Sequence, residues 1–399
     1  EPVKEVISNL KLRASYGFTG NTEIGVYESL ATLGTSNWIL GNQLVSGFFP
    51  NKIPNPDLKW ERTGQFDIGL DLGLFNNRLR ITTDYYKKKT TDLLYSVAVP
   101  ATSGYQTMLK NIGSIENQGY ELSIESDNLT GAFSWTTAFN IAFNRNKVLE
   151  LGGEEYKEMA EGDGHLKTGS VRRLIVGEPI GVFYGYRFDG IFQNEEECKQ
   201  QTSSASPIGV GLRRYKDLNG DGKVDAANDR EILGDANPKF FGGLTNTFAY
   251  KGFELNVFLQ YSYGNKILNY NAMELENPTG GQNAYADMVN RWTPENPSNI
   301  YPKATTNRAL LVSDRFIEDG SYLKLKTLSL SYSFPKINLK HIQGLRLYVT
   351  GQNLLTWTKY RGYDPEVSYR GASTLEAGED FGGYPQSRTF MFGIKLDIK

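Results

Sequence analysis

Apolar and polar residues alternate along about ten stretches of the chain, and no other feature of the sequence constrains the fold as strongly. In the clearest stretch, every second residue from Phe66 to Leu74 is apolar, and the residues between them are aspartate or glycine. A period of two is the period of a β-strand, in which successive side chains point to opposite faces. The sequence therefore predicts an all-β chain whose strands have one apolar and one polar face.

The gaps between the alternating stretches are short and long in turn. The expected strands are 10–18, 64–74, 79–85, 120–125, 133–143, 244–250, 253–263, 322–334, 345–353 and 389–398. The five long gaps are about 19–63, 96–118, 146–239, 264–321 and 355–387. Bacterial outer-membrane barrels have short periplasmic turns, long extracellular loops and an even strand number. The pattern predicts a transmembrane antiparallel up-and-down β-barrel, with the strand-like stretch 183–192 placed inside the third loop.

Composition removes several classes of protein. The net charge of −2 offers no basic field for nucleic acid, and the single cysteine, Cys198, excludes an internal disulfide. No run of about 18 apolar residues exists, so a spanning helix is not expected. The first residues do not have the pattern of a signal peptide, and we expect a segment upstream of Glu1. A soluble antiparallel sandwich or solenoid also alternates, but its strands and loops are seldom this long.

The sharpest local motif is DLNGDGKVDAAND, which has the spacing of a calcium-binding loop. Alternate oxygen ligands converge on a hard cation in such loops, and a glycine permits the sharp turn. The expected ligands are Asp217, Asn219, Asp221, Lys223 through its carbonyl, Asp225 and Asp229. Asn228 stands where a bidentate glutamate belongs, so the affinity for Ca²⁺ is expected to be weak. The alternative is an Asx-rich turn held by its own hydrogen bonds. No organic cofactor is expected.

Histidine is scarce, because the chain contains only His165 and His341. A Ser/His/Asp triad is therefore improbable, and the chain is not expected to be an enzyme. The residues leave open a stand-alone small outer-membrane barrel, such as an adhesin or a surface protease, and a soluble glycan-binding β-protein.

Aromatic residues crowd the long gaps and the ends of the strands. Packing inside the loops is the simpler explanation for most of them. The candidates for contact with a substrate or partner are Trp292, Tyr301, Trp357, Tyr360 and Tyr363. Five others lie beside expected periplasmic turns, where an interfacial aromatic girdle against lipid is favoured. These five are Phe133, Trp135, Phe248, Tyr250 and Phe334.

Several long strings resemble one family. They are NPDLKWERTGQFDIGLDLGLFNNRLRITTDYYKKKTTDLL, NIGSIENQGYELSI, the string from DLNGDGKVD to FLQYSYGN, and YLKLKTLSLSYSFP. Together they are similar to the SusC/RagA TonB-dependent transporters of Bacteroidetes, over Leu10 to Lys399. The chain departs from the usual outer-membrane pattern at its end, where an aromatic residue is common and Ile398-Lys399 stands instead.

The resemblance implies that residues 1–399 are the C-terminal portion of a 22-stranded barrel, without its plug domain and earlier strands. It implies import of glycans or peptides across the outer membrane, with energy supplied by the TonB complex through the plug. It also implies a SusD-like surface lipoprotein as a lid over the extracellular loops. The chain is expected to be a multi-pass part of the outer membrane, in contact with its lipid.

Overall fold

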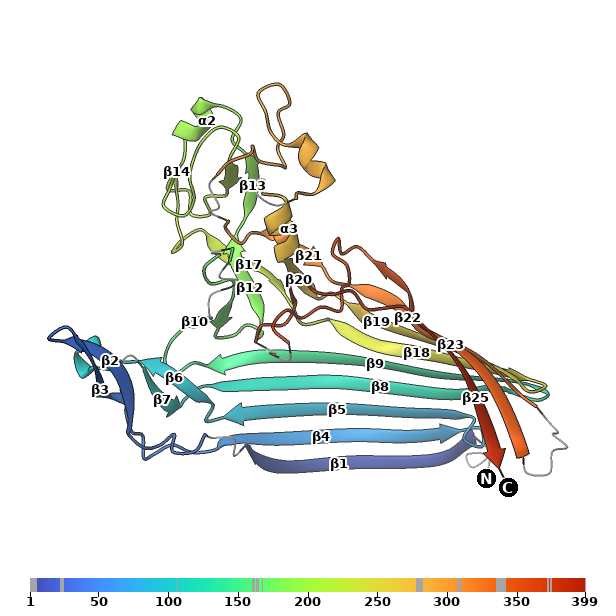
Figure 1. The fold of residues 1–399 in the computed structure, drawn as a ribbon. Coiled ribbons are helices and arrows are strands. Elements are labelled where there is room, and N and C mark those ends of the chain that lie inside the picture. The colour runs from blue at the N-terminus through green and yellow to red at the C-terminus, as the bar shows by residue number, and fades with distance from the viewer. Residues whose placement is uncertain are drawn as a thin grey trace.

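Ten long antiparallel strands form one sheet in the computed structural model (Figure 1). The structure describes residues 6–21, 25–105, 107–159, 162, 165–166, 168–277, 283–306, 310–334, 342–371, 373 and 375–398. The strands are β1 (Ile7–Asn21), β4 (Glu61–Leu74), β5 (Leu79–Thr91), β8 (Ser114–Thr130), β9 (Phe133–Glu150), β18 (Phe240–Tyr250), β19 (Phe253–Tyr263), β22 (Tyr322–Ser333), β23 (Ile342–Thr358) and β25 (Thr389–Ile398). They pair in chain order, so the predicted count and up-and-down topology are confirmed.

The register keeps one apolar face across neighbouring strands. Leu12 pairs with Leu70, and Ile68 pairs with Tyr85, whereas Lys11 pairs with Asp71 on the other side. Because side chains alternate, this register puts most apolar residues of the strands on one surface and mostly polar residues on the other. We call these surfaces the apolar face and the polar face. The sheet is a single layer, which is not the architecture of the sandwich alternative.

Short turns join the strands at one end of the sheet, which we call the turn end. Asn76 and Asn77 have φ of 57° and 61°, the left-handed conformation that asparagine tolerates in tight hairpins. Lys251 and Gly252 form the two-residue turn between β18 and β19, with φ of 46° and 88°. The turn expected between β22 and β23 lies mostly in 335–341, outside the described residues.

The predicted boundaries of the long gaps were wrong by several residues at the opposite end, the loop end. β8 already begins at Ser114 and β9 continues to Glu150, so 114–118 and 146–150 belong to strands. Asn117 still pairs with Asn146 there. Polar residues occupy both faces of these strand ends, so the alternation fades although the backbone pairing continues.

The long gaps contain secondary structure of their own. Two hairpins are formed by β2 (Thr32–Leu40) with β3 (Gln43–Lys52) and by β6 (Leu94–Ala98) with β7 (Thr107–Asn111). The third gap contains β10 (Tyr156–Glu158), β11 (Arg173–Ile175), β12 (Val182–Tyr186), β13 (Phe188–Ile191), α2 (Glu195–Lys199), β14 (Thr202–Ser203), β15 (Arg213–Tyr215), β16 (Lys223–Val224) and β17 (Arg230–Asp235). Two of these, β12 and β13, contain most of the stretch 183–192, which is part of the loop and not of the ten-stranded sheet.

Three long gaps, 146–239, 264–321 and 355–387, combine into one lobe that stands over the sheet (Figure 1). Its central sheet takes β20 (Lys266–Asn269) and β21 (Ile317–Asp319) from the second of these gaps and β24 (Glu379–Asp380) from the third. Helix α3 (Tyr270–Leu275) packs beside this sheet, and short 3₁₀ turns span Ala101–Ser103, Ala286–Asn290 and Asp314–Phe316. Phe183, Leu268 and Phe316 belong to the apolar core of the lobe and are fully buried.

Among the described residues, none of the helices has the length and apolar character needed to cross a membrane.

Candidate functional site

The candidate calcium loop forms tight turns between β15 and β17. The two carboxylate oxygens of Asp217 accept the backbone N–H groups of Gly220 and Gly222, each at 2.7 Å. Both glycines have positive φ, at 76° and 80°, so the chain reverses sharply around the carboxylate. The carboxylate of Asp221 accepts the N–H of Lys223 at 2.8 Å. The loop therefore gathers the oxygens of two expected ligands around its own backbone.

The second half of this loop is held in the same way. Buried Asp229 accepts the N–H groups of Leu218 at 2.8 Å and Asp225 at 2.7 Å, while Asn219 donates its side-chain amide to the Asp221 carboxylate. The hydrogen bond from the Lys223 ammonium lowers the pKa of the Asp225 carboxyl. Within the described part of the chain, no group of three or more His, Cys, Asp or Glu side chains is arranged to hold a metal ion. Calcium binding stays a prediction.

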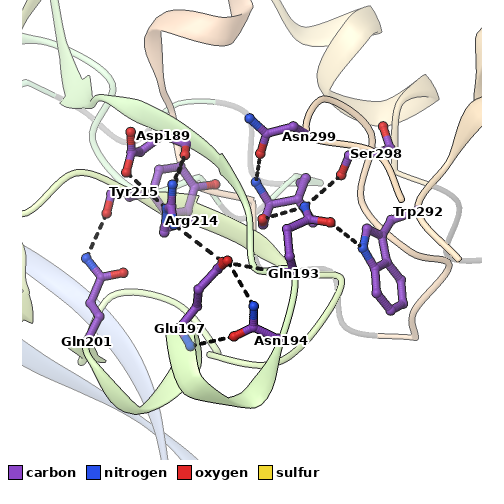
Figure 2. Close-up of polar contacts among 11 residues, drawn as sticks. Asp189, Gln193, Asn194, Glu197, Gln201, Arg214, Tyr215, Trp292, Ser298 and Asn299 are labelled. Atoms are coloured by element: carbon purple, nitrogen blue, oxygen red, sulfur yellow. Dashed lines mark hydrogen bonds and ion pairs between the residues drawn. The ribbon is translucent and has the colours of Figure 1, made fainter. Parts of the chain in front are cut away.

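Two of the five candidate contact aromatics pack inside the lobe. Trp292 is 9% exposed, and its indole N–H donates to the side-chain oxygen of Gln193 at 3.0 Å (Figure 2). Tyr360 is also buried, and its hydroxyl donates to Asp380 at 2.5 Å. Burial raises the pKa of the Tyr360 phenol, and the neighbouring Asp380 carboxylate acts in the same direction. These two aromatics have the environment expected for packing.

The other three candidates lie in different surroundings. Trp357 pairs with Leu323 on the apolar face of the sheet, where lipid contact is expected. Tyr301 is partly buried and donates its hydroxyl to Asp287 at 3.3 Å. Tyr363 is 80% exposed, so its ring is the most accessible of the five. The structure does not gather the five into one surface, and Tyr363 is best placed to meet a molecule from outside.

A polar network fixes the tip of the lobe, as Figure 2 shows. Asn194 caps α2 by accepting the N–H of Glu197 at 2.9 Å, and Glu197 accepts the N–H of Gln193 at 2.9 Å in return. Arg214 on β15 joins this network through Asp189 at 3.0 Å and Glu197 at 3.4 Å. An asparagine followed three residues later by a glutamate is a helix-start signal that could have located α2 from the sequence.

A buried ion pair joins the gaps 146–239 and 355–387 of the lobe. The Arg172 guanidinium donates to Glu379 at 2.8 Å, and both side chains are 2% exposed. The same guanidinium donates to the carbonyl oxygens of Gly181 and Ala377. The two residues are 207 positions apart, and no local pattern marks either of them. Sequence reasoning missed this pair, which we call the Arg172 latch.

A second buried carboxylate, that of Glu276, joins the gaps 264–321 and 355–387. It accepts hydrogen bonds from Arg315 at 2.6 Å and from Arg361 at 2.7 Å, one at each oxygen. Its backbone carbonyl accepts a further hydrogen bond from Arg213, in the gap 146–239, at 3.0 Å. A buried carboxylate needs such partners, because an unpaired charge is costly in a dry interior. Glu276 therefore links all three gaps of the lobe.

The gap 355–387 is also tied to the polar face of the sheet. Lys324 of β22 is buried and contacts Asp364 at 2.5 Å and Glu366 at 2.7 Å. Burial by itself would raise the pKa of Glu366, but hydrogen bonds from Lys324 and Lys326 outweigh it and lower this pKa. The loop after β23 therefore folds back over the polar face near the loop end.

Charged side chains on the polar face pair across strands. Arg13 of β1 donates to Asp71 of β4 at 3.0 Å and contacts Asp84 of β5 at 2.8 Å. Gly69 makes this possible, because a side-chain carbon at that position would lie 2.2 Å from Asp84 and 2.8 Å from Arg13. The polar face is thus an ordered, hydrophilic surface of the kind that lines a barrel lumen.

A mainly apolar cavity of about 430 Å³ lies where the loop ends of β5, β8 and β9 meet the lobe. Val148, Leu174 and Leu375 line it, and Lys157 forms part of its wall. The Lys157 ammonium lies 3.4 Å from the centroid of the Tyr95 ring, and burial lowers its pKa. Cavities of this volume accommodate small ligands or a single group of a larger one.

The family model described as "TonB dependent receptor-like, beta-barrel" matches residues 5–354. The chain is 41% identical, over 397 residues, to the TonB-dependent receptor P3 of Formosa agariphila, covering 98% of this chain and 39% of that protein. It is 30% identical to the TonB-dependent receptor SusC of Bacteroides thetaiotaomicron, covering 98% and 38%.

Solved structures give the same picture. The structure titled "RagAB peptide importer in the 'open-open' state" superimposes with a TM-score of 0.79 and 27% sequence identity. The match covers 98% of this chain and 40% of that one. The chain thus spans about two fifths of the length of the relatives that it matches.

Proposed function

Because this chain belongs to the TonB-dependent receptor-like β-barrel family, we propose that it forms part of the wall of an outer-membrane transporter importing oligosaccharides or peptides. One observation carries the proposal: ten strands in chain order, apolar on one face and polar on the other, match transporter relatives over 98% of the chain. An apolar face suits lipid, and a polar face suits a solute pathway. In this arrangement the turn end is periplasmic and the loop end is extracellular.

The lobe is the proposed docking platform for a SusD-like surface lipoprotein. Its three gaps are joined by the Arg172 latch and by Glu276, so it presents a fixed surface and not separate loops. A partner that closes over the mouth requires such a surface, because rigid surfaces lose less conformational entropy on binding. The cavity beside Lys157 lies at this mouth and is the proposed place for one apolar group of the substrate. Energy would come from TonB acting on a plug domain of the whole protein.

Uptake by cells that carry the intact transporter gene tests this function. Fluorescent oligosaccharides and peptides of graded length are offered to wild-type cells, to cells without the transporter and to cells without TonB. We expect uptake of one oligomer class to be lost in both deletion strains, while monomers still enter through porins. The class that is lost identifies the substrate. Oligomer uptake that continues without TonB would contradict the proposal.

Calcium binding by the DLNGDGKVD loop is a second proposal, supported by its ligand spacing and its two positive-φ glycines. Titrating calcium into the intact protein by calorimetry should give a Kd of about 10⁻⁴ to 10⁻³ M, the range of extracellular sites. Asp217→Asn with Asp221→Asn should abolish this heat, because two anionic ligands are lost. Asp189→Asn, elsewhere in the lobe, should leave it unchanged. An intact protein without calcium heat would end this proposal.

A further inference from the structure

Basic side chains gather on the apolar face, at the loop end of the first strands. The register aligns residues of β1, β4, β5, β8 and β9 in rows across the sheet. From the middle of the strands outward, the rows are Ala14, Ile68, Tyr85, Tyr120 and Phe143; then Tyr16, Phe66, Lys87, Gln118 and Arg145; then Phe18, Gly64, Lys89, Glu116 and Lys147; then Gly20, Arg62 and Thr91. The last three rows carry five cationic side chains and one carboxylate, Glu116.

The turn end of the same five strands differs. Its rows on the apolar face are Leu10, Leu72, Ile81, Ile124 and Phe139, and then Leu74, Leu79, Ser126 and Thr137. None of these side chains is charged. Lysine and arginine can reach either membrane interface by extending along their stems. Such a general tendency would place cations at both ends of the strands. The five cations stand at the loop end alone, and this group, which we call the basic belt, needs another explanation.

The belt contains a groove, which we call the basic groove. It has a volume of about 390 Å³ and lies over β1, β4 and β5. Aromatic rings and cations line it together. The rings are Tyr16, Phe18 and Phe66, and the cations are Arg62, Lys87 and Lys89. Gly64 lies between them, and a side-chain carbon at this position would meet the Phe18 ring at 3.0 Å.

The cations of the groove are only partly neutralised. Lys87 pairs with Glu116 at 3.1 Å. The Arg62 guanidinium lies over the Phe18 ring at 3.9 Å, and among the described residues no carboxylate pairs with Arg62 or Lys89. Two cations therefore remain available beside an aromatic floor. This combination suits an amphiphile with an anionic head and an apolar tail.

We propose that the basic groove binds the phosphate-bearing headgroup of an anionic lipid in the extracellular leaflet. The phosphate lies among Arg62, Lys87 and Lys89, and the acyl chains continue along Tyr16 and Phe66 toward the aliphatic rows. Charge complementarity and continuity with the apolar face support this occupant. The inference rests on the membrane orientation in the proposed function but goes beyond it, because it concerns the outside of the wall and not the transport path.

The test uses the intact transporter purified in detergent and native mass spectrometry, with a phosphorylated lipid A and its dephosphorylated form as probes. The Lys87→Gln/Lys89→Gln variant should bind the phosphorylated lipid about 30-fold more weakly, since each cation near a charged lipid surface contributes about 1 kcal/mol. The matched control is Lys11→Gln/Lys88→Gln, which removes two cations from the polar face of the same strands. The control should bind like the wild type.

Equal binding by both variants would overturn the proposal. If the groove variant does not assemble, the wild-type protein still decides: preference for the phosphorylated lipid supports the proposal, and equal binding of the two lipids overturns it. Competition by inorganic phosphate alone at the lipid's own concentration would also overturn it, because the aromatic floor would then contribute nothing. The readout requires no uptake, so its failure is distinct from failure of the transport proposal.

Discussion

Arg172→Met is expected to destabilise the lobe by about 3 kcal/mol, because it leaves the buried Glu379 carboxylate without its main partner. The carbonyls of Gly181 and Ala377 lose their donors in the same variant. Breaking a buried ion pair usually costs about 3–5 kcal/mol. The lower end of this range applies, since Arg370 still approaches Glu379 at 3.4 Å. Hydrogen exchange on the intact protein should show faster exchange around β11, β12 and β24, with the ten long strands still protected.

Two further variants complete this experiment. Arg187→Met removes two ion pairs, with Glu231 and Asp314, whose arginine is 44% exposed. Exposed pairs contribute only about 0–1 kcal/mol each, so the effect on exchange should be smaller than that of Arg172→Met. Arg172→Met/Glu379→Met should recover much of the lost protection, because an apolar pair can replace a buried ion pair of similar volume. Unchanged exchange in Arg172→Met would show that the latch does not hold the lobe together.

Deleting residues 264–321 from the intact transporter, with a short turn in their place, is expected to reduce uptake to background while the wall stays folded. This segment supplies Leu268, Met273 and Phe316 to the core of the lobe, so the other two gaps lose their shared interior. The wall does not depend on it, because Ser262 pairs directly with Tyr322 and a short turn can rejoin β19 to β22. If the deletion variant still resists unfolding by detergent when it is run on a gel, the wall has survived.

Point variants separate loss of the lobe from simple loss of chain. Phe316→Ala, at a fully buried position, should cost about 3–5 kcal/mol and reproduce much of the uptake defect. Tyr384→Ala, at a position 92% exposed, should leave uptake near the wild-type level. Normal growth of the deletion strain on its cognate nutrient would refute a role for the lobe in import.

The long strands were predictable because their information is local. Alternation over Phe66 to Leu74 fixes which side chains share a face, and the Asn76-Asn77 pair fixes where the chain turns back. The ends of the strands were predicted less well, since Ser114 and Glu150 lie where polar residues occur on both faces and the period of two disappears. Hydrogen bonding continues there without any pattern in the side chains.

The candidate site was predictable only in part. The DLNGDGKVD loop lies inside the long gap where it was expected, whereas the bounds of the long gaps were right only to within several residues. Strings resembling the family gave no sign that Trp292 and Tyr360 pack inside the lobe whereas Tyr363 is exposed. Aromatic content says that a loop has a core of its own, but it does not say which ring enters that core.

The sequence by itself determined the ten strands, their two faces and the ends at which short turns and long loops lie, because each follows from residues near one another in the chain. Only the tertiary structure decided how three long loops become one lobe. That result depends on partners such as Arg172 and Glu379, which meet across 207 positions. Neither residue has a local periodicity, and a buried ion pair is recognisable only when folding has removed both charges from water.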